Sequence, residues 1–136
     1  MNFPVDLSEN SCRLLDKLGF KLEEAYDKGM WKGWLWKNCE MGLSLSYDRG
    51  YYECEVIPLK KPGQGMVLIR LLRFLKDDQT FYRKEIIKSN LYNCLPADEY
   101  MNVFFRNYEL ISAFMETLDE DRLKAYEAFD FGPWGL

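Results

Sequence analysis

Residues 41–57 read MGLSLSYDRGYYECEVI, and their pattern is the clearest indication of the fold class. Apolar and polar residues alternate on both sides of its turn: Leu43, Ser44, Leu45 and Ser46 before it, and Tyr52, Glu53, Cys54, Glu55 and Val56 after it. Such alternation is typical of strands with one buried face. Asp48, Arg49 and Gly50 suit a tight turn in which the glycine takes a positive φ. The stretch therefore predicts an antiparallel β-hairpin.

The residues before this hairpin repeat its pattern. The sequence YDKG at 26–29 matches YDRG at 47–50 with one basic residue exchanged. Leu22 and Tyr26 have the same parity, so we expect them on one strand face. These patterns therefore predict an antiparallel meander that ends at Pro58. The four predicted strands cover residues 20–26, 30–37, 41–47 and 51–57.

Helical patterns surround the predicted sheet. Leu14, Leu15 and Leu18 lie near one face of a helix that Gly19 would end. Helices are predicted over residues 7–18, with Asp6 as the cap, over 66–75 and 80–91, from Pro96 along an apolar stripe to Leu118, and after an Asp119 cap. This order predicts a single α+β domain over residues 1–136, with helices packed on one face of the sheet.

The composition excludes several kinds of chemistry. The chain of 136 residues has no histidine, so Ser-His-Asp and Cys-His catalysis are impossible within it. Eighteen basic and 22 acidic residues give a net charge of −4, which suits neither nucleic acid nor an anionic membrane. No apolar run approaches the ~20 residues of a membrane span. We expect a protein that is not an enzyme and holds no cofactor or metal.

The cysteines point to a reducing compartment. Cys12, Cys39, Cys54 and Cys94 form no CxxC pair. The first residues, MNFPVDLSENS, lack the basic and apolar regions of a secretory signal. We therefore expect reduced thiols in a cytoplasmic protein.

Three tryptophans lie within the stretch MWKGWLWK at 30–37. Trp34 and Trp36 have the same strand parity, whereas Trp31 has the other. They fit a strand covered on both faces, an aromatic anchor for a protein partner, or, with the interleaved lysines, a stacking surface for single-stranded nucleic acid. The charge of the chain disfavours the last of these.

Acidic residues gather around the predicted hairpins, at Glu23, Glu24, Asp27, Glu40, Asp48, Glu53 and Glu55. Glu53 and Glu55 lie two positions apart, so both side chains point to one face of their strand. Strand alternation alone explains such a solvated face. A basic partner, or a pair of carboxylates for acid-base chemistry or a hard metal ion, would use the same residues.

Three phrases carry a resemblance to a known class of proteins. They are Leu18-Gly19-Phe20, residues 43–56, and Leu71-Leu72-Arg73-Phe74-Leu75. Over about residues 14–75 the chain resembles small bacterial immunity proteins encoded beside polymorphic toxins. The resemblance implies a protein that binds a cognate toxin and blocks it.

The leading hypothesis is a non-catalytic protein-binding domain with a basic partner such as a toxin. Its expected contacts are the acidic residues Glu23, Glu24, Asp27, Asp48, Glu53 and Glu55 and the aromatic residues Trp31, Trp34 and Trp36. The alternatives are a ligand-binding or enzymatic domain with an aromatic-lined pocket between sheet and helices, and a structural homodimer. The C-terminal residues 131–136 fit either a docking peptide or a segment folded over the core.

Overall fold

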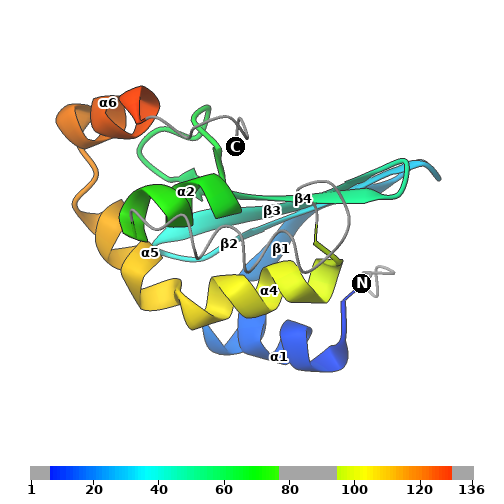
Figure 1. The fold of residues 1–136 in the computed structure, drawn as a ribbon. Coiled ribbons are helices and arrows are strands. Elements are labelled where there is room, and N and C mark those ends of the chain that lie inside the picture. Colours follow the sequence, from blue (N-terminus) through cyan, green and yellow to red (C-terminus); the bar gives the residue numbers. More distant parts are fainter. Residues whose placement is uncertain (1–6, 77–94, 130–136) are drawn as a thin grey trace.

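The computed structural model describes residues 7–76 and 95–129, and these form one antiparallel sheet with helices beside it (Figure 1). The strands are β1 (Lys21–Asp27), β2 (Trp31–Lys37), β3 (Met41–Asp48), β4 (Tyr51–Pro58) and β5 (Met66–Val67), in this spatial order. The helices are α1 (Glu9–Lys17), α2 (Leu68–Lys76), α4 (Ala97–Arg106), α5 (Tyr108–Glu116) and α6 (Glu120–Ala128). The predicted α+β class is confirmed.

The meander follows the predicted strands to within one residue at each end. The fifth strand was not predicted. Met66 pairs with Val56 and Val67 with Glu55, so the first two residues of the predicted helix 66–75 belong to the sheet, and α2 begins at Leu68. A short apolar run does not distinguish a buried strand from the first turn of a buried helix.

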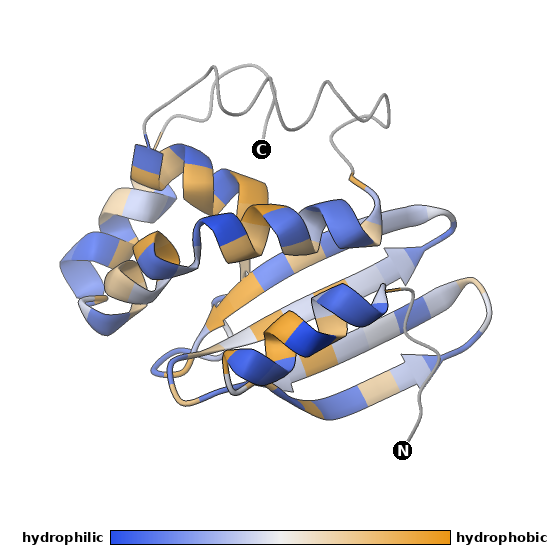
Figure 2. Cartoon of the chain, turned by 90° about the horizontal axis from the view of Figure 1, so that it is seen from below, coloured by the Kyte–Doolittle hydropathy of each residue, from blue (hydrophilic) through white to orange (hydrophobic). Residues whose placement is uncertain are grey.

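The inner face of the sheet carries the core. Its residues at the centre of β2, β3 and β4 are at most 6% exposed: Trp34, Trp36, Leu43, Leu45, Cys54 and Val56. Helices α1 and α4 lie on one side of the sheet, and Figure 2 views the sheet from that side. An aromatic trio fixes this layer, because the rings of Phe20, Phe104 and Tyr108 meet edge to face with centroids 5.6–6.3 Å apart.

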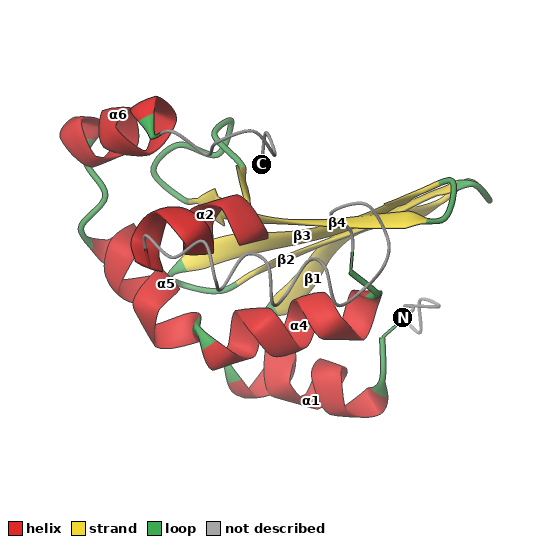
Figure 3. Ribbon diagram, viewed as in Figure 1, coloured by secondary structure: helices red, strands yellow, loops and turns green. Residues whose placement is uncertain are grey.

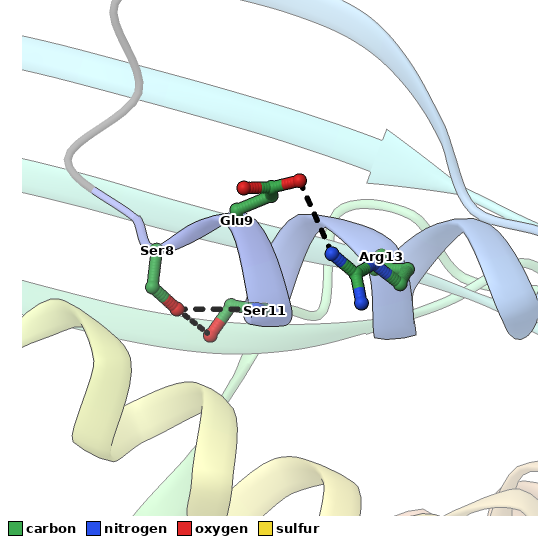
Figure 4. A network of polar contacts seen from close by, with 4 residues as sticks. All are labelled: Ser8, Glu9, Ser11 and Arg13. Atoms are coloured by element: carbon green, nitrogen blue, oxygen red, sulfur yellow. Dashed lines mark hydrogen bonds and ion pairs between the residues drawn. The ribbon is translucent and has the colours of Figure 1, made fainter.

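Helix α1 begins at Glu9, two residues later than predicted, because Ser8 occupies the cap position. The Ser8 hydroxyl accepts a hydrogen bond from the Ser11 amide at 3.2 Å (Figure 4). Glu9 and Arg13 form an exposed ion pair at 3.1 Å one turn apart. Asp98 at the start of α4 accepts from the Ser11 hydroxyl at 2.8 Å, which joins α1 to α4.

A second difference from the predicted helices lies between Pro96 and Leu118. The apolar stripe that leads to Leu118 is interrupted at Asn107, whose side-chain amide donates to the Val103 carbonyl at 2.8 Å. The predicted Asp119 cap is confirmed, since its carboxylate accepts from the Arg122 amide at 2.8 Å. The predicted helix 80–91, Cys94 and the tail 131–136 lie outside the described residues. No helix in the described ranges is long and apolar enough to cross a bilayer.

Candidate protein-binding surface

The two matching turns lie side by side at one end of the sheet. Gly29 has φ 78°, and the Asp27 carboxylate accepts from its amide at 3.0 Å. Arg49 and Gly50 both have positive φ, 51° and 98°, as a two-residue hairpin turn requires. The Arg49 amide donates to the Met30 carbonyl at 3.0 Å and so links the two turns. This end of the sheet projects beyond the described helices (Figure 3).

The strand register defines the outer face of the sheet, opposite the core. Directly paired residues on antiparallel strands point to the same face. Two cross-strand rows on the outer face run next to each other at the turn end, Trp31–Asp48–Tyr51 and Tyr26–Gly33–Ser46–Glu53. The following row on this face is Glu24–Leu35–Ser44–Glu55.

Large apolar side chains are exposed at the turn end of the sheet. The exposed fractions are 46% for Tyr26, 58% for Met30, 44% for Trp31 and 47% for Tyr51. The Arg49 guanidinium lies 5.8 Å from the centre of the Trp31 ring. We call Tyr26, Met30, Trp31 and Tyr51 the aromatic end. Several exposed aromatic residues grouped in one place mark an interaction surface more often than single ones do.

Gly33 allows Tyr26 to lie against the sheet. A Cβ atom on Gly33 would stand 2.4 Å from Tyr26 Cε1, so the tyrosine ring occupies the space that a side chain would take. The next residue in the row, Ser46, is also small. The ring therefore rests on the strand backbone, where half of its surface faces outward.

Acidic groups share the outer face with the aromatic end. Glu53 lies in the row of Tyr26, and Asp48 lies between Trp31 and Tyr51. Glu55 is half-buried, and burial, followed by the charge of Glu53, raises the pKa of its carboxyl above the usual value. The two carboxylates therefore repel each other, as like charges two positions apart on one strand face do.

The structure brings five of the nine predicted contact residues to the outer face: Glu24, Trp31, Asp48, Glu53 and Glu55. The prediction that Trp34 and Trp36 contact a partner was wrong. They are only 2% and 6% exposed, because both side chains lie in the core. Glu23 lies at a bulge in β1 and pairs with Lys37 at 3.4 Å. Asp27 holds its own turn and lies on the inner-face row of Lys32.

Sequence reasoning did not assign Tyr26, Met30 and Tyr51 to the surface. The register shifts between Leu22 and Glu24, and this bulge moves Tyr26 from the face of Leu22 to the opposite face. The expectation that these two residues share a face was therefore wrong. The alternation in β4 did indicate that Tyr51 lies on the outer face, because its parity is opposite to that of the buried Cys54.

Two of the described cysteines have a raised thiol pKa, which lowers their reactivity. Cys54 is completely buried, and burial raises the pKa of its thiol far above the usual value, so it stays protonated near neutral pH. Burial and the charge of Asp98 raise the pKa of Cys12. Among residues 7–76 and 95–129, no group of three or more potential metal ligands lies together.

Comparison with known protein families, curated proteins and solved structures finds no match for this chain.

Proposed function

We propose that this protein is a protein-binding domain that docks a basic partner on the outer face of its sheet. The observation that carries the proposal is the grouping of exposed Tyr26, Trp31 and Tyr51 on the same face as Asp48 and Glu53. Aromatic side chains dominate the binding energy of many interfaces, whereas acidic neighbours set register and increase the rate of association.

The proposed partner is a toxin whose basic surface the domain covers. This step rests on the resemblance of residues 14–75 to bacterial immunity proteins and on the net charge of −4. In this mechanism Trp31 inserts as the anchor, and Asp48 and Glu53 face lysine or arginine side chains. The complex then blocks the toxin by occlusion, without chemistry in the domain itself.

Capture of partners from native lysate tests the proposal. The tagged wild-type domain is compared at low and high salt with Trp31→Ala and with the pair Glu53→Lys and Glu55→Lys, and bound proteins are identified by mass spectrometry. We expect a stoichiometric basic protein that both variants lose and that high salt weakens.

The matched control reverses two acids on the helices, Glu109→Lys with Glu127→Lys. It makes the same change in net charge, and both residues are exposed. Capture that survives the outer-face variants, with all variants folded by circular dichroism, would contradict the proposed surface. Light scattering of the purified protein measures its molar mass and so tests the homodimer alternative.

The ligand-binding alternative has less support. It places an aromatic-lined pocket between the sheet and the helices. The cavity of about 410 Å³ lies instead at the end of the sheet remote from the aromatic end, and none of its lining residues is aromatic.

A further inference from the structure

The cavity of about 410 Å³ is formed by three parts of the chain at the β2–β3 turn. The turn contributes Cys39 and Glu40, the end of β4 and the following loop contribute Pro58, Leu59 and Lys60, and α5 with its following turn contributes Ser112, Met115, Glu116 and Leu118. Its volume lies within the ~300–1,000 Å³ of small-molecule sites. Because the β2–β3 turn is at the other end of the sheet, the cavity is separate from the aromatic end.

Hydrogen bonds fix the wall formed by the β2–β3 turn. The Asn38 side-chain amide donates to the Leu18 carbonyl at 3.0 Å and to the Tyr108 hydroxyl at 2.9 Å. Its oxygen accepts from the amides of Glu40 and Met41, both at 2.9 Å. The turn is thus held to α5 and to the end of α1.

The carboxylate of Glu40 is held as well, since the Tyr108 hydroxyl donates to it. Burial, followed by this hydrogen bond, raises the pKa of Tyr108 to about 12, so the tyrosine remains a donor at neutral pH. Next to the lining residue Lys60, Lys61 forms an ion pair with Glu120, which links the loop after β4 to α6. The wall with Glu40 is therefore held in place before binding, which lowers the entropic cost of binding there.

The lining has two chemical zones. Pro58, Met115 and Leu118 are buried and apolar. Glu40, Glu116 and Lys60 are exposed and form a charged rim. Two carboxylates against one ammonium leave the rim with a net charge of −1 near neutral pH.

We propose that this cavity binds a small organic amine, with its alkyl or aryl body on the apolar floor and its ammonium group at the carboxylates of Glu40 and Glu116. An ammonium donates three hydrogen bonds and suits carboxylate acceptors from two different walls. An anionic ligand of the same size would meet two like charges and only one opposite charge. The proposal does not depend on the partner surface.

Three probes with the same six-carbon body test the charge selectivity: hexylamine, hexanol and hexanoate. Binding to the full chain is followed by chemical shift changes in a ¹⁵N correlation spectrum. We expect saturable shifts at residues 39–40, 58–60 and 112–118, with hexylamine about ten-fold tighter than hexanol, the effect of one charge-assisted contact. Hexanoate should bind the most weakly.

Two variants with opposite expected signs keep the test independent of folding. Glu116→Gln should weaken hexylamine about ten-fold by removing one charged acceptor. Lys60→Met removes the competing ammonium and should tighten hexylamine by a few-fold. Glu109→Gln, on the same helix but outside the cavity, should leave the affinity unchanged.

Equal affinity for hexylamine and hexanol, an absence of saturable shifts at the cavity, or hexylamine binding that Glu116→Gln does not weaken would each overturn the amine site. Trp31→Ala should leave the hexylamine titration unchanged. The lysate experiment on the outer face and this titration can therefore fail separately.

Discussion

Trp31 and Trp34 lie three positions apart on the same strand and occupy opposite environments. Trp34 points into the core and is 2% exposed, whereas Trp31 lies on the outer face and is 44% exposed. The strand alternation separates the two residues, because it points Trp34 to the inner face and Trp31 to the outer face. A single tryptophan-rich segment thus supplies both the core and the proposed partner anchor.

The two faces also differ in what a substitution can change. An inner-face side chain is surrounded by fixed neighbours, so its loss leaves a cavity. An outer-face side chain has solvent on one side, so its loss affects mainly what binds there.

Trp34→Ala should lower the free energy of unfolding by about 3–5 kcal/mol, the usual cost of removing a buried tryptophan. Trp31→Ala should lower it by less than about 1 kcal/mol, as surface substitutions do, while it abolishes partner capture. Urea denaturation at neutral pH measures the free energy of unfolding of both variants. A Trp31→Ala variant as unstable as Trp34→Ala would show that Trp31 also stabilises the fold, and would contradict the proposed difference between the two faces.

A smaller effect tests how Tyr26 lies on the outer face. Gly33→Ala places a methyl group where the Tyr26 ring now lies, so the ring must move away. Because a tyrosine side chain can rotate, we expect a loss of stability of about 1 kcal/mol, within the range for overpacking. Urea denaturation gives the value, and tyrosine ring resonances report the displacement.

The Tyr26→Ala background is the control for this contact. Gly33→Ala should cost little or nothing there, since alanine is otherwise better than glycine in a strand. The difference between the two backgrounds is the coupling of residues 26 and 33. A coupling near zero would mean that the ring does not rest on Gly33 in solution.

The sequence was sufficient for the meander because alternation and turn residues act locally. Residues such as Leu43, Leu45, Cys54 and Val56 each carry their own parity, and Gly29 and Gly50 fix the turns between strands. The two-residue strand β5 was not predicted because it depends on pairing with β4, across the loop that follows Pro58. A local sequence pattern does not show which distant residues will pair.

The proposed surface was only partly predictable for a related reason. Parity placed Glu53 and Glu55 together correctly, and it separated Trp31 from Trp34. The bulge after Leu22 inserts one residue without any glycine or proline to mark it, so it reversed the expected face of Tyr26. The cavity at the other end depends on three distant segments, and no spacing within the sequence brings them together.

The smallest predicted effect concerns the solvation of the outer face at Glu55. Its pKa is raised in the folded protein, first by burial and then by Glu53. The folded state therefore holds this proton more tightly than the unfolded state does, and stability falls as the pH rises from the usual carboxyl pKa through the higher folded value. Glu55→Gln removes this half-buried charge, so it should stabilise the protein at pH 7 by less than about 1 kcal/mol.

The gain from Glu55→Gln should vanish below both pKa values of Glu55, because the wild-type carboxyl is then neutral in both states. Urea denaturation at a series of pH values measures this slope. Glu53→Gln sharpens the test, since it leaves Glu55 in place and should lower its pKa in a carboxyl NMR titration by removing the neighbouring charge. A gain that persists unchanged at low pH would come from packing. Glu55 would then belong with the inner-face residues, where shape decides stability, and not with the solvated acids beside Trp31.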